Sequence, residues 1–165
     1  MTQAAALDAC HWREPGGAAA ARVICSFLAG IGVELEVGPF DGPDLLPGLA
    51  VRRGSIRIDP SAEVFPGDLL HEAGHIAVTA PELRATLDQV GDDPGEEMAA
   101  IAWSVAAARA CGVPLEVLFH PEGYKGGSAA MLAAFADNRG PGIPMLGWYG
   151  LGEIGAFPAM TRWLR

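Results

Sequence analysis

Apolar and polar residues follow two different periods in the first third of the chain. Over residues 16–32, apolar residues recur every three or four positions, which predicts an amphipathic helix. Over residues 33–37, apolar and acidic residues alternate, which predicts a half-buried strand. Alternation resumes over residues 49–59 on both sides of an Arg-Gly pair. This pattern predicts a β-hairpin whose Ile56 and Ile58 face the core.

Two later segments predict buried helices. The first begins near Pro66 and must end by Ala80, because Pro81 cannot continue it and disfavours a helical residue before it. The second covers residues 94–111 and stops at Gly112. Its apolar residues occupy nearly every face, so we expect it to be a central element of the core.

The remaining segments have weaker patterns. Residues 1–15 predict a loose lead-in, and residues 113–120 (VPLEVLFH) fit either a strand or a helix. Residues 126–138 predict a short amphipathic helix. Residues 139–158 are rich in glycine and proline but also apolar and aromatic, which predicts an irregular segment that packs on the rest of the fold.

Together these elements predict one α+β domain over residues 1–165, with an N-terminal helix, a short antiparallel sheet and two buried helices. A length of 165 residues, 50% of them hydrophobic, suits a domain of ordinary size with a substantial core. The net charge of −9 and the single lysine, Lys125, argue against nucleic acid as a direct partner.

We expect a cytoplasmic protein without a membrane segment. The longest apolar run, residues 98–108, is well short of the roughly 20 residues that span a bilayer. Residues 1–17 lack the basic start and apolar run of a secretory signal. Three widely spaced cysteines without a Cys-x-x-Cys pair fit a reducing compartment.

The strongest chemical signal is His71-Glu72-x-x-His75, within the first buried helix. Residues four apart lie on one helical face, about 6 Å apart along the axis, so two imidazoles can converge on one zinc ion. Glu72 projects about 100° round the helix from His71. From there it can act as general base on a zinc-bound water. The motif therefore supplies two ligands and a base.

The residues around the motif favour a metal site over a coincidence. Ala73 and Gly74 leave space on the metal side, and the flanking positions are apolar, which predicts a buried helix. Burying two histidines and a glutamate is costly unless they ligate a metal or form hydrogen bonds. The alternative is that the three side chains only form hydrogen bonds within the core.

A catalytic zinc needs a third protein ligand and one open position. The His-x-x-Gly-x-x-His arrangement would require a histidine at Pro81, so that class of site is excluded. Glu96 and Glu97 begin the second buried helix. With Asp93 as N-cap, Glu96 stands at the position of a capping box, which leaves Glu97 as the preferred ligand. The less favoured candidates for the third ligand are Asp92, Asp93, His11 and His120.

Glu97 also shares a helical face with small residues. Ala100 and Ser104 lie on that face together with Ile101, and we expect them to let another helix approach closely. The two buried helices would then meet near the histidines.

These motifs resemble those of the ImmA/IrrE-type zinc metallopeptidases, which are small gluzincins. The order of helix, strand, LPGLAVRRGSIRID hairpin, LLHEAGH helix and EEMAAIAW helix is similar to theirs over residues 16–110. In that family the second helix tends to read Glu-x-x-Ala-x-x-aromatic, which Glu97, Ala100 and Trp103 match. The resemblance implies a zincin-like fold with Glu97 as zinc ligand. The stretch FHPEGYKGGSAAML and the glycine-rich end lie outside the family pattern, and no helix-turn-helix module is visible.

A peptidase also needs a hydrogen-bond donor for the developing oxyanion. His120 and Tyr124 are the candidates, and the alternatives are that His120 caps an element and Tyr124 packs on the surface. The sequence then predicts a zinc-dependent metallopeptidase that acts on a peptide or protein. We expect the substrate to lie along an edge strand, such as the one ending in SIRID.

Two other functions stay open at this point. A regulatory or protein-interaction module could keep the zinc site without catalysis, although Glu72 has no role in merely holding a metal. A helical interaction protein could carry the same histidines and glutamate as hydrogen-bonded core residues.

Overall fold

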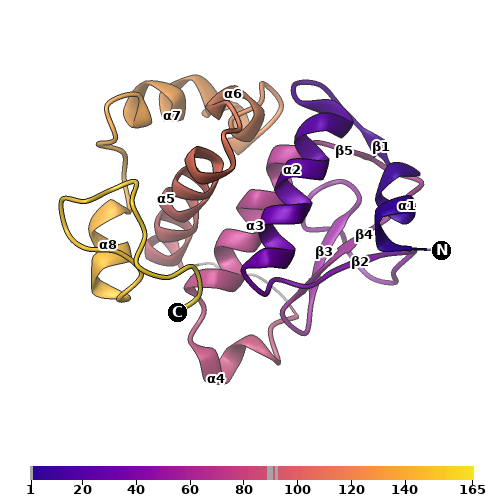
Figure 1. The fold of residues 1–165 in the computed structure, drawn as a ribbon, viewed down its shortest axis with the longest axis horizontal. Coiled ribbons are helices and arrows are strands. Elements are labelled where there is room, and N and C mark those ends of the chain that lie inside the picture. Colours follow the sequence, from indigo (N-terminus) through magenta and orange to yellow (C-terminus); the bar gives the residue numbers. More distant parts are fainter. Residues whose placement is uncertain (1, 89–90, 92) are drawn as a thin grey trace.

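A computed structural model describes residues 2–88, 91 and 93–165 of the chain. The fold is α+β, with the strands gathered on one side of the helices (Figure 1). The helices are α1 (Gln3–Asp8), α2 (Gly17–Gly30), α3 (Pro66–Val78), α4 (Pro81–Arg84), α5 (Pro94–Cys111), α6 (Leu115–Leu118), α7 (Ser128–Phe135) and α8 (Ile143–Trp148). The strands are β1 (His11–Trp12), β2 (Leu35–Val37), β3 (Leu49–Arg52), β4 (Ser55–Ile58) and β5 (Glu63–Val64). A 3₁₀ turn, η1 (Tyr124–Gly126), precedes α7.

The strands form two small sheets. In the larger one, β4 is central, pairing antiparallel with β3 and parallel with β2. Ile56 and Ile58 are fully buried, while Arg57 reaches Glu36 at 2.9 Å, which confirms the predicted alternation. The smaller sheet is the parallel pair of β1 and β5.

Two expectations about the larger sheet are wrong. The sheet is mixed rather than antiparallel, because β2 runs parallel to β4. The strand within SIRID is β4, which lies in the centre and therefore cannot receive a substrate as an edge strand. Alternation indicates which face of a strand is buried, but it carries no information on strand order or direction.

The first fifteen residues are more ordered than expected from their sequence. They contain α1 and β1 rather than a loose lead-in. The Trp12 indole donates to the Leu7 carbonyl at 2.9 Å, and Arg22 of α2 pairs with Asp8 at 2.9 Å. The first contact folds the segment on itself and the second ties it to α2. Neither contact leaves a periodic signal in the sequence.

Later segments resolve what the sequence left ambiguous. Within residues 113–120 the chain forms the short helix α6, not a strand. Helix α7 lies inside the predicted helix over residues 126–138. The segment 139–158 is irregular except for α8, and its Leu146 and Leu151 are buried in the core, as its apolar composition predicts.

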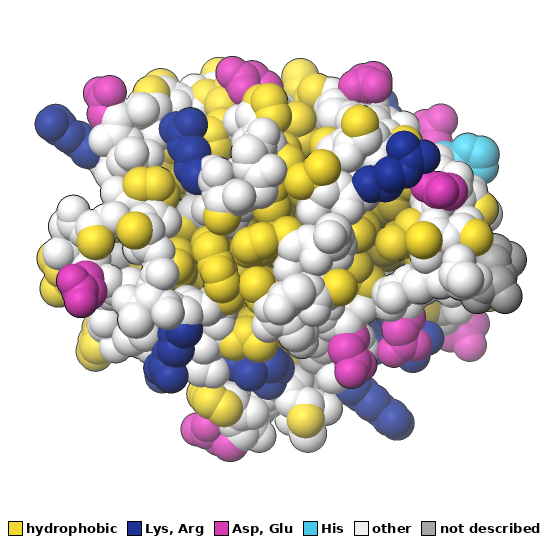
Figure 2. Space-filling view, viewed as in Figure 1, with side chains coloured by type: hydrophobic (Ala, Val, Ile, Leu, Met, Phe, Trp, Pro, Cys, Tyr) yellow, Lys and Arg dark blue, Asp and Glu magenta, His cyan; other side chains and the backbone are white. Residues whose placement is uncertain are grey.

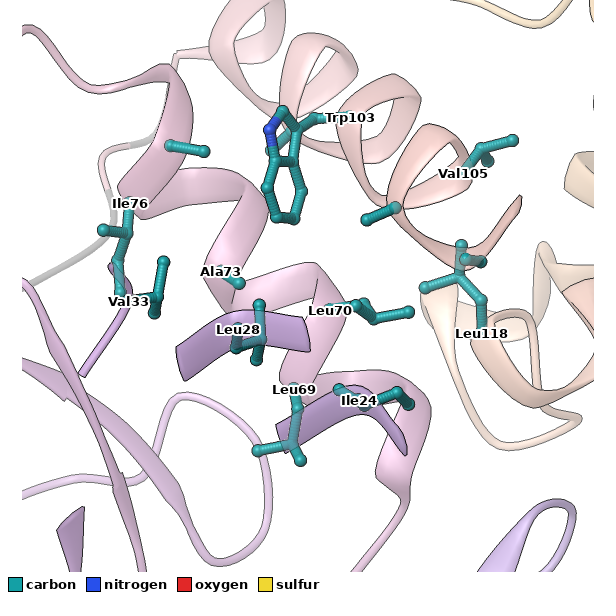
Figure 3. Packing of buried hydrophobic residues seen from close by; sticks show 14 of the residues in the cluster. Ile24, Leu28, Val33, Leu69, Leu70, Ala73, Ile76, Trp103, Val105 and Leu118 are labelled. Atoms are coloured by element: carbon teal, nitrogen blue, oxygen red, sulfur yellow. The ribbon is translucent and has the colours of Figure 1, made fainter. Parts of the chain in front are cut away.

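The core lies where α3 packs between α2 and α5 (Figure 3). The side chains that fill it are at most 1% exposed: Ile24 and Leu28 from α2, Leu69, Leu70, Ala73 and Ile76 from α3, and Trp103 and Val105 from α5. The prediction that both long helices are buried is confirmed. Helix α3 ends at Val78, ahead of Pro81, and α5 stops where Gly112 adopts a left-handed conformation with φ 69°.

Helices α3 and α5 approach closely at a glycine. A Cβ atom added to Gly74 would lie 2.5 Å from the Ala100 carbonyl oxygen and 2.9 Å from Ser104 Oγ. The Ser104 hydroxyl donates to the Ala100 carbonyl at 2.7 Å and lies 2.9 Å from the Leu70 carbonyl oxygen across the interface. The expectation that the small residues of α5 admit a neighbouring helix is confirmed.

Apolar side chains also reach the surface. Figure 2 shows hydrophobic atoms in the middle of one face, with charged side chains mostly toward its rim. A shallow groove is lined by residues of α2 and of the connection between α5 and α6, among them Ala19, Val23 and Val113. Among the described residues, no helix has the length and apolar character needed to cross a membrane.

Gly74→Ala should destabilise the fold although alanine is the better helix former. The added methyl would overlap backbone of α5, and such overpacking costs about 1–3 kcal/mol, against a gain of roughly 1 kcal/mol in helix propensity. Urea unfolding measures the difference. Gly30→Ala is the matched control, because nothing lies within 4 Å of its added Cβ. Equal stability of the two variants would contradict the close approach.

Candidate metal centre

Three side chains converge where the N-terminal end of α5 meets the middle of α3. Helix α3 supplies His71 and His75, and the first turn of α5 supplies Glu97. The two histidine Nε2 atoms are 3.2 Å apart. Glu97 places Oε1 3.4 Å from His71 Nε2 and Oε2 3.0 Å from His75 Nε2. Their ligand atoms all lie within 4.8 Å of one another, so the three residues form a site that can hold a metal ion.

The environment sets the charges that a metal site requires. Burial, followed by the nearby His75, lowers the pKa of His71 to about 4, so its ring is neutral near pH 7. The hydrogen bond with His75 is the main cause that lowers the pKa of Glu97 below its usual value, against its partial burial. Metal ligands must be neutral imidazoles and ionised carboxylates, and this triad presents both forms. The residues therefore fit a metal ion, with three protein ligands and room for a fourth position.

Glu72 lies next to the triad and is not part of it. Its side chain is buried, with 3% of the residue exposed, and it lines the same cavity as His71, His75 and Glu97. Burial raises the pKa of its carboxyl group to about 7. Its Oε2 has no hydrogen-bond partner among the described residues. A buried carboxyl group without a partner is costly, so its presence beside the triad is consistent with a chemical role.

The triad lies between two cavities that share a wall. One cavity, of about 390 Å³, contains Arg13, Glu63 and Glu122, and we call it the charged arm. The other, of about 610 Å³, contains Leu45, Ile101 and Met131 together with Glu72, His75 and Asp93, and we call it the second arm. The residues that line both arms are Leu46, His71, Glu97, Tyr124 and Lys125. A ligand can therefore extend from the triad in two directions.

His120 is bound to another residue of the charged arm. Its Nε2 lies 2.8 Å from Asp68 Oδ1, and its ring stacks on Phe65 at 3.7 Å between centroids. Its Nδ1 is buried and has no partner within the described part of the chain. Neither ring nitrogen is thus free and accessible. In this arrangement His120 orients Asp68 rather than offering a donor to a ligand.

Tyr124 reaches the triad from outside. Its hydroxyl oxygen lies 3.4 Å from His71 Nδ1, the nitrogen that faces away from Glu97. Tyr124 and Lys125 both have φ 53°, a left-handed conformation that costs a residue with a side chain roughly 1 kcal/mol or more. Glycines stand on both sides of this pair, at 123 and 126. The strained turn holds the two side chains at the cavities.

The other candidates for the third ligand are not part of the group. Asp93 caps α5, its carboxylate accepting from the Gly95 and Glu96 amides at 2.8 and 3.4 Å. The return bond of a capping box from Glu96 stays a prediction. His11 is exposed on β1, and Asp92 lies outside the described residues.

The sequence pattern did not indicate several residues that line the cleft formed by the two arms. Asp68 could have been noticed, because it precedes His71 by three residues and so shares its helical face. Arg13, Glu63 and Glu122 come from distant segments, and only the fold brings them together. In the sequence, Lys125 stands out only as the single lysine of the chain.

No family model, curated protein or solved structure matches this chain. The geometry of the site therefore carries the functional argument.

Glu97→Ala should abolish metal binding, whereas Glu96→Ala should retain it. Removing a direct ligand leaves only two donors, so the affinity loss should exceed the roughly 10–100-fold that changes behind the ligands cost. Plasma mass spectrometry on the purified variants gives the metal content per chain, and circular dichroism checks folding. Metal retained in Glu97→Ala at the wild-type level would exclude the triad as the site.

Proposed function

We propose that the chain is a zinc-dependent hydrolase of peptide or amide bonds, in which His71, His75 and Glu97 hold the ion. The observation that carries the proposal is the buried Glu72, which stands beside a complete set of three ligands in an open cavity. A site that only held metal would not need this second carboxyl group, which is not one of the three ligands. Two imidazole nitrogens and one carboxylate suit zinc.

The finer identity follows as part of the same proposal. Two histidines on one helix and a glutamate from a later helix, here α3 and α5, are the ligand set of a gluzincin. We propose a divergent relative of the ImmA/IrrE-type peptidases, supported by the packing of α3 on α5. A peptide or protein substrate would lie in the cleft formed by the two arms.

The chain's own residues would divide the chemistry between them. When bound, zinc supplies a Lewis acid that polarises a carbonyl and lowers the pKa of a water molecule. Glu72 takes the proton from the attacking water and passes it to the leaving amine. Burial raises the pKa of Glu72 above its usual value, which makes the carboxylate a stronger base. Tyr124 steadies the His71 ring through Nδ1, and His120 holds Asp68 at the wall of the charged arm.

A non-catalytic metal-binding module is the second candidate. One observation favours it: only 3% of Glu72 is exposed, which restricts its access to a bound substrate. Such a module would use the ion to join α3 and α5 and would present the cleft to a partner protein. Metal content alone does not separate the two functions, since both retain the ion.

The variant Glu72→Gln separates the proposed hydrolase from the non-catalytic module. As a general base Glu72 should contribute about 10²–10⁴-fold to hydrolysis, while the amide should leave zinc content and fold unchanged. The assay is cleavage of a mixture of unlabelled peptides of diverse sequence by the zinc-loaded protein, followed by mass spectrometry. Glu96→Gln is the matched control, because it makes the same chemical change outside the triad. Zinc-loaded wild type that cleaves no peptide, or that cleaves no faster than Glu72→Gln, would favour the non-catalytic module.

A further inference from the structure

Lys125 occupies the point where the two arms of the cleft meet. It lines both cavities together with His71 and Glu97. The Lys125 side chain therefore borders the space beside the triad.

The charge of Lys125 has no partner of its own within the described part of the chain. None of the ion pairs within 4.0 Å there includes it. The other cation of the cleft, Arg13, is neutralised by a bidentate pair with Glu122 at 2.8 and 2.6 Å and also stacks on Phe65. Lys125 is thus the cation of the described cleft that can meet an anion from outside.

The backbone holds Lys125 in place at an energetic cost. Its φ of 53° is a conformation that glycine adopts freely, and three nearby positions, Gly123, Gly126 and Gly127, are glycines. A glycine at position 125 would relieve the strain without loss of packing, because the lysine side chain is exposed. Strained residues cluster at functional sites, so this strain at the cavities points to a function of the Lys125 side chain.

From these observations we infer that Lys125 binds a carboxylate of the substrate close to the bond that is cleaved. The inference rests on the function proposed above and names its substrate class: peptides that carry a carboxylate near that bond. The carboxylate can be a chain terminus or an acidic side chain. Lys125 is exposed, whereas Glu72 and His75 are buried. Its ammonium group can therefore contact a carboxylate that belongs to the substrate.

The test compares matched small probes in the zinc-loaded full chain. N-acetyl-leucine carries a carboxylate and N-acetyl-leucinamide does not, and ligand-observed NMR titration measures both dissociation constants. The ratio of the two constants should be about fivefold larger in wild type than in Lys125→Met, which is the upper range of an exposed ion pair. Direct binding of the acid to zinc would occur in wild type and in Lys125→Met alike. It therefore cancels when the ratios of the two proteins are compared. Lys125→Arg should retain most of the ratio.

Two further variants serve as controls. Arg109→Met makes the same change in net charge at an exposed position outside both arms, and it should retain the wild-type ratio. Lys125→Gly should lose the ratio while its Tm stays equal to wild type or rises by up to about 3 °C, because the strain is removed. An acid preference that is unchanged in Lys125→Met, or a clearly lower Tm in Lys125→Gly, would overturn the inference.

A third probe identifies the source of the carboxylate. The N-acetyl α-amide of glutamic acid presents an acidic side chain and a neutral end. If its binding also depends on Lys125, the site accepts acidic side chains; if only N-acetyl-leucine shows the dependence, it selects chain ends. Zinc content is measured in parallel. A chain without zinc whose acid preference still depends on Lys125 would refute the proposed hydrolase and keep the anion site.

Discussion

The close contact between α3 and α5 is the constraint on which the rest of the structure depends. Because Gly74 has no side chain, α3 and α5 lie so close together that an added methyl group would overlap the backbone of α5. The Ser104 hydroxyl lies at this interface. The same contact places the first turn of α5 beside the histidines, so Glu97 reaches both rings. Helix packing and ligand geometry are therefore one feature, and a shift of either helix would change both.

The electrostatics of the centre follow from that packing. Burial keeps His71 neutral and raises the pKa of Glu72, while the hydrogen bond with His75 keeps Glu97 ionised. Two glutamates beside the same pair of histidines thus have pKa values shifted in opposite directions, because they differ in solvent access and in partners. Glu97 has the ionised form that a metal ligand needs, whereas Glu72 can exchange a proton near neutral pH.

The segment after α6 supplies what the two long helices lack. It brings Tyr124 to His71 Nδ1 and Lys125 to the junction of the arms, through two consecutive left-handed residues. His120, at its start, is tied to Asp68 and to Phe65. The pair of long helices thus carries the triad, and a strained turn carries Tyr124 and Lys125 at the cavities. Binding residues often lie on loops that a rigid scaffold positions.

The sequence by itself determined the local features. Helical spacing placed His71, Glu72 and His75 on one buried helix, and the capping position of Asp93 indicated Glu97 over Glu96. These features depend on neighbours within a few residues, which a sequence pattern records. Only the tertiary structure decided that β4 is central, that His120 binds Asp68, and that Lys125 lines both arms. Each of these depends on segments far apart in the chain, whose approach is set by how the whole core packs and leaves no period in the sequence.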